Sequence, residues 1–333
     1  MTKPYKTTGA IVVRRHGPPE VLEWDTVALD RPEAGEVLMR HTAVGLNFID
    51  AYHREGLYPL GLPFIPGVEG AGVIEEVGPG VADFKQGDRV AYTGNGPPGS
   101  YTEWRVLPAG RLVRLPDAID DIMAAGLMLK GCTVEYLIRR TFSVRENHWV
   151  LWHAAAGGVG LIACQWLNAI GAQVIGTVGS TAKAELAQQH GCHHVILYRQ
   201  EDVVARVKEI TGGDGVDVVY DSVGKDTFAG SLDVLRPRGM LVSFGNASGA
   251  VDPFPPLLLS QKGSLFLTRP SLGHYYSEPR EFRDGCEAVF DAVVSGMVVV
   301  PVRQTVPLRE AARAHTELQA RRTTGATVFT VAG

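Results

Sequence analysis

Residues 148–171 constrain the fold of this chain more than any other stretch. An apolar run at 149–154 is typical of a strand that is buried on both faces of a parallel sheet. The turn AAGGVG follows at 155–160, and a helical pattern then continues to Gly171, a natural C-cap. Strand, glycine turn and helix in this order match the fingerprint G/A-x-G-x-x-G, with Ala155 in its first place. The stretch therefore predicts a βα unit that binds a dinucleotide.

Two glycines of the turn have separate mechanical roles in such a unit. Gly157 lets the backbone approach a pyrophosphate, and Gly160 lets the helix pack closely against the strand. The free N–H groups and the positive dipole end of the helix then face the phosphates. An ordinary glycine-rich turn is the alternative, but the complete strand–turn–helix order favours dinucleotide binding. We expect the backbone contacts to come from Ala156, Gly157, Gly158, Val159 and Gly160.

The residues after the second apolar strand indicate which dinucleotide is bound. In NAD enzymes an acidic residue lies about 20 residues after the glycine turn and binds the ribose 2′-hydroxyl. Gly179 and Ser180 occupy that place here, and no carboxylate occurs before Glu185. A hydroxyl with Lys183 and Tyr198 beyond it suits a 2′-phosphate, which a carboxylate would repel. Although Lys183 could instead be a solvated residue of the next helix, the pattern favours NADPH over NADH, held by Gly179, Ser180, Lys183 and Tyr198.

Composition and charge narrow the class of protein. With 333 residues the chain is long enough for two domains, each with its own core. The net charge of −4, without a basic stripe, does not indicate nucleic acid as a partner. There is no signal-peptide pattern and no apolar run long enough to span a membrane, so we expect a cytoplasmic protein. Four cysteines far apart in the sequence argue against a disulfide framework and a structural zinc site.

The pattern of predicted secondary structure changes along the chain. Residues 1 to about 125 contain short β-like runs broken by Gly and Pro, which predict a partly open β-barrel. A helix is expected over 120–129. From 130 to 270 strands and helices alternate regularly, which predicts an α/β fold with a doubly wound six-stranded parallel sheet. The strands of that sheet are expected near 150–154, 172–178, 193–197, 216–220, 239–244 and 264–268, and those of the barrel at 9–13, 36–40, 72–77 and 88–92.

The last part of the chain carries mixed elements. We expect a helix at 278–295, a strand at 298–302, a helix at 308–320 and a final strand at 326–331. We expect this tail to return to the first domain, which would make that domain discontinuous. The resulting division is 1–129 for the first part of the barrel domain, 130–270 for the nucleotide domain and 271–333 for the tail.

Several motifs carry a resemblance to a known family. They are VGLNFIDAY at 44–52, IPGVEGAG at 65–72, HAAAGGVG at 153–160, DSVG at 221–224, VSFGN at 242–246 and LTRPSL at 267–272. With the order of domains, they resemble the medium-chain dehydrogenase/reductase superfamily. Within it the chain is similar to the zinc-independent quinone oxidoreductases, the family of zeta-crystallin, and most of all to the bacterial NADPH-dependent ones. The resemblance covers nearly the whole chain and implies a Rossmann domain beside a GroES-like barrel domain.

The chain departs from the zinc-dependent branch of that superfamily. Zinc alcohol dehydrogenases carry a cysteine where Asn47 stands and Gly-His-Glu where this chain has Gly67-Val68-Glu69. The region 93–113 holds no cysteine, so the four-cysteine lobe is missing. The adjacent His193 and His194 would point to opposite faces of a strand. No set of three zinc ligands remains, and we expect no metal.

A site without a metal favours particular acceptors. Reducing an aldehyde or a simple ketone creates an alkoxide, which needs a Lewis acid or a proton donor. A quinone or an α,β-unsaturated ketone takes hydride to give a delocalised anion, so orientation and exclusion of water suffice. We therefore expect NADPH-dependent reduction of quinones. One alternative is a reductase of α,β-unsaturated ketones or enoyl thioesters, for which Arg139-Arg140 is the one basic pair near the domain junction. Another is an NADPH-binding structural or regulatory protein without turnover.

The resemblance implies a substrate site in the cleft between the domains. Asn47, Asp50 and Tyr52 follow the strand that reaches this cleft, so we expect them there, with Tyr58 nearby. Tyr52 is the candidate hydrogen-bond donor to the acceptor oxygen, and Asn47 is the candidate partner of the nicotinamide ribose. Each has a plainer alternative, because a loop Asn often caps a helix and a Tyr often packs. Asp50 is expected to be structural.

Other residues are expected on the cofactor side of the site. Strand ends of an open α/β sheet are where such ligands bind. The candidates are Thr133 and Tyr136 in a Lys-Gly-x-Thr-x-x-Tyr pattern, Ser222 after the fourth strand, Phe244, Gly245 and Asn246 after the fifth, Leu267 and Arg269 at the sixth, and Arg321 in the tail. Arg321 could equally be a solvated helix-end arginine. The late strand at 264–268 leaves a sheet edge that in this superfamily often pairs across a two-fold axis, so a homodimer is expected.

Overall fold

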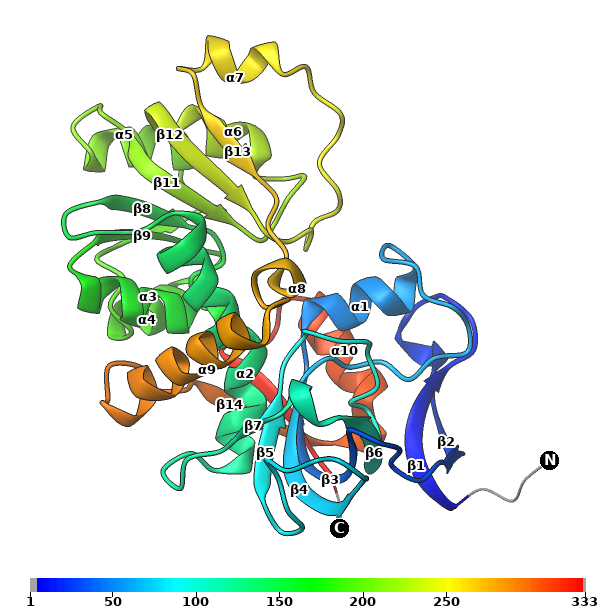
Figure 1. The fold of residues 1–333 in the computed structure, drawn as a ribbon. Coiled ribbons are helices and arrows are strands. Elements are labelled where there is room, and N and C mark those ends of the chain that lie inside the picture. The colour runs from blue at the N-terminus through cyan, green and yellow to red at the C-terminus, as the bar shows by residue number, and fades with distance from the viewer. Residues whose placement is uncertain (1–4, 332–333) are drawn as a thin grey trace. The chain divides into compact units, whose positions relative to one another are not determined.

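The computed structural model describes residues 5–331, which form two compact units (Figure 1). Unit 1 comprises the residues up to Cys132, Tyr275–Val294 and the residues from Val300 on. Unit 2 comprises Thr133–His274 and Ser295–Val299. The expected domain boundaries after 129 and after 270 stay predictions, because compactness alone does not define an independent domain.

Unit 2 is built on a six-stranded sheet in which every neighbouring pair of strands is parallel. The strand order is β10-β9-β8-β11-β12-β13, so the order reverses between β8 and β11. This confirms the doubly wound parallel sheet, with a topological switch point at the carboxyl ends of β8 and β11. The strands are β8 (Trp149–Trp152), β9 (Gln173–Val178), β10 (His194–Leu197), β11 (Val216–Asp221), β12 (Leu235–Ser243) and β13 (Phe266–Thr268).

Helices connect these strands and cover the sheet. They are α3 (Gly158–Ile170), α4 (Thr181–Gln189), α5 (Val203–Ile210), α6 (Phe228–Asp233) and α7 (Leu257–Gln261), with α8 (Leu272–Tyr275) after β13. The strands read as continuous apolar runs because both faces of the sheet are covered. Leu151, Ile175, Val219 and Leu241 of four neighbouring strands form one buried cluster with Leu232 of α6.

Unit 1 contains a seven-stranded sheet and a separate two-stranded sheet. The order of the larger sheet is β14-β15-β3-β4-β5-β7, with β6 also paired to β3, and the smaller sheet pairs β1 with β2. The strands are β1 (Lys6–Val13), β2 (Leu22–Leu29), β3 (Glu36–Gly45), β4 (Gly70–Val77), β5 (Arg89–Tyr92), β6 (Trp104–Pro108), β7 (Val113–Arg114), β14 (Val302–Pro307) and β15 (Ala326–Thr330). Val328 of β15 pairs antiparallel with Gly45 of β3, so the last strand belongs to the sheet of the first 132 residues.

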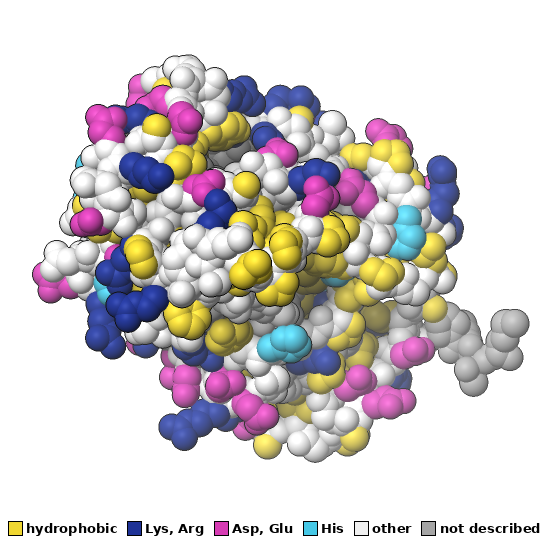
Figure 2. Space-filling view, turned by 90° about the horizontal axis from the view of Figure 1, so that it is seen from above, with side chains coloured by type: hydrophobic (Ala, Val, Ile, Leu, Met, Phe, Trp, Pro, Cys, Tyr) yellow, Lys and Arg dark blue, Asp and Glu magenta, His cyan; other side chains and the backbone are white. Residues whose placement is uncertain are grey.

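The longer helices of unit 1 are α1 (Phe48–Glu55), α2 (Asp121–Tyr136), α9 (Pro279–Val294) and α10 (Ala311–Gln319). The last residues of α2, from Thr133 on, belong to unit 2. The helix expected at 120–129 therefore continues to Tyr136, and a π-helical turn follows at Leu137–Thr141. No helix of the described chain has the length and apolarity that crossing a bilayer requires. The face in Figure 2 carries basic and acidic side chains interspersed with apolar ones.

Some local expectations were wrong. The strand expected at 298–302 begins only at Val302, because Pro301 has no N–H for a ladder and Val302 donates back to the Val300 carbonyl in a tight turn. The strands β2, β6 and β7 and the helix α1 were not anticipated. The helix α1 has only eight residues, and Asp50 and Arg54 are buried in it beside Ala51 and Tyr52, so the polarity of its sequence does not follow its burial.

Candidate functional site

The fingerprint turn lies between β8 and α3, as the sequence predicts. Gly157 is the N-cap of α3, and Gly171 ends the helix with a φ of 86°. A Cβ on Gly160 would lie 2.5 Å from the Ala154 carbonyl oxygen and 2.6 Å from that of Ala155, so only glycine fits. The first N–H groups of a helix have no partner within it and can bind an anion. The turn thus fits a pyrophosphate group, and the binding itself stays a prediction.

A buried chain of hydrogen bonds lies at the carboxyl ends of β8, β9 and β11. Ser231 donates to Asp221 Oδ2 over 3.1 Å, so the hydroxyl of Ser231 accepts from His153 Nε2, 3.0 Å away. His153 Nδ1 must then accept from the Thr177 hydroxyl, also at 3.0 Å. Burial lowers the pKa of His153 against the opposing charge of Asp221, so this imidazole is neutral.

Asp221 is the end of that chain and shapes the loop that follows β11. Its Oδ1 accepts from the backbone N–H groups of Val223 (2.7 Å) and Gly224 (3.0 Å), and its Oδ2 also accepts from Thr227 at 2.7 Å. Asp221 is 1 % exposed, and each of its two carboxylate oxygens accepts hydrogen bonds from two donors. The sequence singled out the motif that contains Asp221 but not this function of the side chain.

The loops after β11 and β12 are locked together at the same edge of the sheet. The N–H of Ala247 donates to the Ser222 carbonyl over 3.1 Å, and the N–H of Ser248 donates to the Val223 carbonyl over 2.8 Å. A Cβ on Gly245 would lie 2.4 Å from the Ser222 oxygen. The structure thereby brings together the expected cofactor residues Ser222, Phe244, Gly245 and Asn246, and the ring centroid of Phe244 lies 5.6 Å from that of Trp152 at the end of β8.

The residues expected around a 2′-phosphate share the β9–β10 corner, defined by Gly179, Ser180, Lys183 and Tyr198. The N–H of Tyr198 donates to Val178, and a Cβ on Gly179 would lie 2.7 Å from the Tyr198 hydroxyl. Ser180 is the N-cap of α4, and Lys183 stands in the first turn of that helix. The corner presents hydroxyl groups and an ammonium at the carboxyl ends of two strands, which is the chemistry that a phosphate requires.

The remaining cofactor candidates are spread over both units. Leu267 of β13 pairs with Leu241 of β12, and Arg269 follows that strand. Thr133 and Tyr136 occupy the last turn of α2 in unit 2, where Tyr136 is buried. Arg321 belongs to unit 1 and follows α10 with a φ of 58°. The part that each takes in binding stays a prediction.

Asn47 is the N-cap of α1, and its side chain has a fixed orientation. Its backbone N–H donates to Asp50 Oδ2 over 2.9 Å. Its side-chain Nδ2 donates to Glu69 Oε1 over 2.7 Å. A carboxylate can only accept hydrogen bonds, so the amide nitrogen faces Glu69 and the amide oxygen points elsewhere. Asn47 thus caps a helix, as its plainer alternative held, and also presents an oriented amide.

Glu69 also accepts from two groups of α2, which sequence reasoning did not anticipate. Lys130 Nζ lies 2.7 Å from Glu69 Oε1, and the N–H of Leu129 lies 2.6 Å from Oε2. Glu69 and Lys130 are buried, and a Cβ on Gly45 would lie 2.1 Å from Glu69 Oε1. We call Asn47, Glu69 and Lys130 the Glu69 cluster. A buried ammonium balances the carboxylate there, and three segments far apart in sequence supply the parts.

Asp50 faces the interior of unit 1 and ends a second chain of hydrogen bonds. Arg54 can only donate, so His315 Nδ1 accepts from it (3.1 Å) and His315 Nε2 donates to the Tyr101 hydroxyl (3.1 Å). Tyr101 donates to Asp50 Oδ2 over 2.9 Å, whereas Asp50 Oδ1 has no partner among residues 5–331. Burial raises the pKa of Asp50 to about 7, and burial with the charge of Arg54 lowers that of His315 to about 3.

Tyr52 lies on α1 with a different set of neighbours. Its ring centroid is 5.2 Å from that of Tyr58 in an edge-on contact and 6.3 Å from that of Phe48. The N–H of Tyr58 donates to the Tyr52 carbonyl over 3.2 Å. The structure therefore brings together the two tyrosines that the sequence proposed for one site. Whether the Tyr52 hydroxyl contacts an acceptor stays a prediction.

The cysteines are closer together than their sequence spacing suggested. Cys132 Sγ of α2 lies 3.9 Å from Cys286 Sγ of α9. A hydrogen bond with Cys192 raises the pKa of the Cys164 thiol, and burial adds to this effect. All four are buried free thiols. Within residues 5–331, no three His, Cys, Asp or Glu side chains gather in a way that could hold a metal ion.

Two family models match this chain. The model described as "Alcohol dehydrogenase GroES-like domain" matches residues 33–117, and the model described as "Zinc-binding dehydrogenase" matches residues 158–291. The match of the first model agrees with the barrel-type domain expected in the N-terminal part. The second covers most of the sheet of unit 2.

Individual proteins match over nearly the full chain. A quinone oxidoreductase of Pseudomonas aeruginosa is 54% identical over 315 residues, which cover 94% of this chain and 97% of that protein. A 2-haloacrylate reductase of a Burkholderia species is 48% identical over 327 residues, 96% of this chain and 98% of that protein. The crystal structure of an Escherichia coli quinone oxidoreductase complexed with NADPH superimposes with a TM-score of 0.93 at 45% identity, covering 97% of this chain and 99% of that one.

Proposed function

The chain belongs to the quinone oxidoreductase family of the medium-chain dehydrogenases/reductases, and we propose that it reduces quinones with NADPH. One observation of the structure carries the proposal. The fingerprint turn at the switch point of the sheet is followed, at the β9–β10 corner, by Ser180, Lys183 and Tyr198 instead of a carboxylate. That arrangement accepts a dinucleotide with a 2′-phosphate and disfavours one with a free ribose.

NADPH has a defined place in this proposal. When bound, it supplies the hydride that the acceptor takes up. The turn from Ala156 to Gly160 holds the pyrophosphate through backbone N–H groups, and the β9–β10 corner holds the 2′-phosphate. Phe244, Gly245 and Asn246 face the nicotinamide half in this proposal, and Leu267 and Arg269 bond its carboxamide. The other candidates for contacts with the cofactor are Thr133, Tyr136, Ser222 and Arg321.

Unit 1 supplies the candidate residues for the acceptor. Tyr52 donates a hydrogen bond to the acceptor oxygen in this proposal, and Asn47 holds the nicotinamide ribose. The Glu69 cluster supports this function because the bond to Glu69 leaves the amide of Asn47 a single orientation. A quinone needs no stronger acid, since the anion formed on hydride uptake is delocalised over its ring.

A reductase of conjugated acids or ketones is the second candidate. The 48% identity to a 2-haloacrylate reductase favours it, because the name describes a conjugated carbon–carbon double bond as the reducible group. Enoyl thioesters of coenzyme A fit less well. Arg139 and Arg140 both pair with the buried carboxylate of Glu135, at 3.8 and 2.9 Å, so one of their two charges is already balanced.

Comparing cofactors and acceptors tests the proposal directly. We expect oxidation of NADPH, and much slower oxidation of NADH, with a benzoquinone and a naphthoquinone, at rates that a chelator does not change. Faster turnover of an enone or a 2-haloacrylate would transfer the assignment to the second candidate. Activity on a saturated aldehyde that the chelator abolishes would contradict both. Tight NADPH binding without turnover of any acceptor would leave the structural or regulatory role.

The substitution Lys183→Met tests the proposed contact between this lysine and the 2′-phosphate of NADPH. Losing a charge-assisted contact should raise the Kd of NADPH about tenfold and leave that of NADH unchanged. Lys208→Met is the matched control, since this exposed lysine lies on α5 of the same unit and away from the β9–β10 corner. Equal effects of the two substitutions on NADPH would mean that only the overall charge of the unit acts on the cofactor.

The assembly and the location of the protein complete the proposal. We propose a homodimer paired through β13, the edge strand of the sheet, where Phe266 is 56% exposed and Leu257 of the preceding helix is 63% exposed. Phe266→Glu should then shift the molar mass measured by light scattering from dimer to monomer. A cytoplasmic location is also proposed, and cell fractionation tests it.

A further inference from the structure

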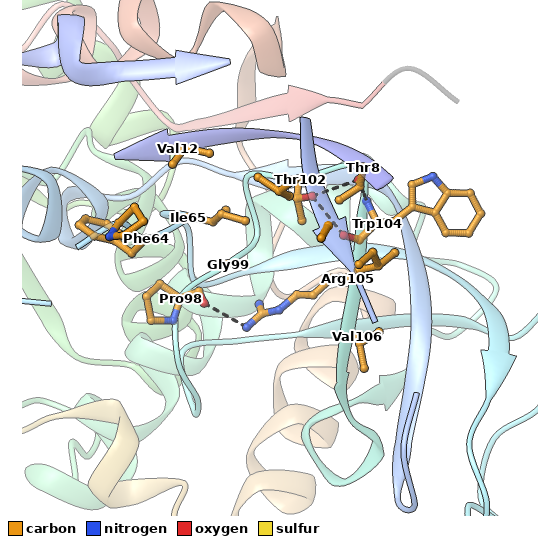
Figure 3. Close-up of a pocket in the computed structure, with 14 residues that line it drawn as sticks. Thr8, Val12, Phe64, Ile65, Pro98, Gly99, Thr102, Trp104, Arg105 and Val106 are labelled. Atoms are coloured by element: carbon orange, nitrogen blue, oxygen red, sulfur yellow. Dashed lines mark hydrogen bonds between the residues drawn. The ribbon is translucent and has the colours of Figure 1, made fainter. Parts of the chain in front are cut away.

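An apolar groove of about 510 Å³ lies in unit 1 and contains none of the residues proposed for NADPH or quinone binding. Its walls come from β1, β2 and β6 and from the segments 63–65 and 98–99 (Figure 3). Val27, Phe64, Ile65, Trp104 and Val106 give it a mainly apolar lining. The volume falls within the range of small-molecule sites.

The two threonine hydroxyls of the groove wall, on Thr8 and Thr102, are paired within the protein. Thr8 Oγ1 accepts from the N–H of Trp104 over 3.0 Å, and the Thr102 hydroxyl lies 3.1 Å from two carbonyl oxygens, to one of which it donates (Figure 3). These two hydroxyls have little to offer a polar ligand, because each already has partners within the protein. The wall accepts apolar groups that remove Val27, Phe64 and Val106 from water.

Arg105 is the exception, and its charge has no counter-ion. Its Nη2 donates to the carbonyl groups of Pro97 (2.8 Å) and Pro98 (3.2 Å), and its guanidinium lies 5.1 Å from the centre of the Tyr92 ring. Between residues 5 and 331 no carboxylate comes within 4.0 Å of Arg105. Figure 3 shows this side chain extending from β6 to Pro98 along the groove.

A second cation, Arg111, acts on Arg105. Burial and then the charge of Arg105 lower the pKa of Arg111, so two guanidinium groups act on one another. An anionic group beside Arg105 would relieve this repulsion, and a carboxylate matches the fork of a guanidinium.

We propose that the groove binds a small amphipathic anion, a medium-chain carboxylic acid. Its hydrocarbon chain lies along Val27, Phe64 and Val106, and its carboxylate pairs with Arg105. The charge of Arg105 selects the head group, and the apolar walls select the chain. The inference is independent of quinone reduction, so either can fail without the other.

Calorimetric titration with three ligands of equal chain length tests both halves of the proposal. Octanoate, octanol and octylamine are titrated into the protein saturated with NADP⁺, so that the nucleotide site is filled. Octanoate should bind about tenfold more tightly than octanol, and octylamine most weakly, because the contact with Arg105 is charge-assisted. Equal binding of octanoate and octanol, or no saturable heat from octanoate, would overturn the proposal.

Four variants locate the binding. Arg105→Met should abolish the difference between octanoate and octanol, whereas Arg105→Lys should keep part of it. Val27→Trp should weaken both ligands by filling the groove from the half-buried side of β2. Arg14→Met is the matched control, since this arginine is already paired with Glu23 and Asp25. If Arg14→Met and Arg105→Met act alike, the anion is attracted by the overall charge and the groove is not its site.

Every variant is first checked for its melting temperature and for NADPH-dependent quinone turnover. Both should match the parent protein, since Arg105 and Val27 have no place in the proposed cofactor or quinone sites. Should Arg105→Met lower the melting temperature through the lost contact with Tyr92, the Arg105→Lys and Val27→Trp titrations still decide the question. Failure of all variants to change octanoate binding would contradict the inference.

Discussion

Two buried aspartates, one in each unit, are held in different ways. Asp221 of unit 2 is 1% exposed and Asp50 of unit 1 is fully buried, and each ends a chain that runs through a neutral histidine. Four donors surround Asp221, two on each oxygen. Asp50 has two donors on Oδ2 and, among the described residues, none on Oδ1. Within residues 5–331, Asp50 therefore lacks the donors on its second oxygen that Asp221 has, and burial raises the pKa of Asp50 to about 7.

The two carboxylates also differ in what they arrange. Asp221 bonds two consecutive backbone N–H groups and so shapes the 222–224 loop at the proposed cofactor edge. Asp50 bonds one backbone N–H, at the start of α1, and otherwise faces side chains of the core. The buried carboxylate of Glu69 in unit 1 is held in a third way, because the ammonium of Lys130 balances its charge. Substitutions of Lys130, Asp221 and Asp50 should therefore change the free energy of unfolding by different amounts.

The largest effect is expected for Lys130→Met. It leaves the buried charge of Glu69 with only the Asn47 amide and the Leu129 N–H, and breaking a buried pair in this way costs about 3–5 kcal/mol of unfolding free energy. Urea denaturation measures the loss. The double variant Glu69→Gln/Lys130→Met should recover part of it, because no charge is then left without a partner.

Lys225→Met is the control for that substitution. Its ammonium pairs with Asp252 at 3.4 Å on an exposed surface, so its removal should cost less than about 1 kcal/mol. Similar losses for Lys130→Met and Lys225→Met would mean that the Glu69 cluster is open to water in solution. Lys130 would then not be what stabilises the charge of Glu69 in unit 1.

An intermediate effect is expected for Asp221→Asn. The amide cannot accept from all four donors, so at least one hydrogen bond to a charged group is lost and the cost is about 2–4 kcal/mol. Because the 222–224 loop loses its anchor, the Kd of NADPH should rise about tenfold as well. Calorimetry measures both changes. Asp233→Asn, on the partly exposed surface of α6, should change neither by a comparable amount.

The parts of this molecule that the sequence predicted are those specified by neighbouring residues. The fingerprint turn is contiguous, and the strands of unit 2 are apolar runs, so periodicity and glycine spacing identify them. The Glu69 cluster joins residues 47, 69 and 130, and the Asp50 chain joins residues 50, 101 and 315. Such contacts leave no local pattern. In α1 the buried side chains include Asp50 and Arg54 beside Ala51 and Tyr52, and the polarity of the first two gives no sign of their burial.

The smallest effect, but the one with the clearest sign, is expected for Asp50→Asn. In the unfolded chain an aspartate has a pKa of about 3.9, whereas burial raises the pKa of Asp50 to about 7 in the folded protein. The folded state therefore holds this proton more tightly, and the contribution of Asp50 to stability falls as the pH rises from about 4 to about 7. An asparagine cannot ionise, so the Asp50→Asn variant does not lose this part of its stability as the pH rises.

The measurement is the free energy of unfolding of parent and Asp50→Asn proteins at about pH 5 and about pH 8, where linkage predicts a gain of about 1–3 kcal/mol for the variant relative to the parent. Taking the difference between the proteins removes the opposite trend of His315, whose folded pKa of about 3 costs stability as the pH falls below about 6.5. Asp30→Asn, at an exposed position of unit 1, should show no such change. A pH-independent difference for Asp50→Asn would mean that Asp50 Oδ1 finds a donor in solution, and the two aspartates would then be held alike.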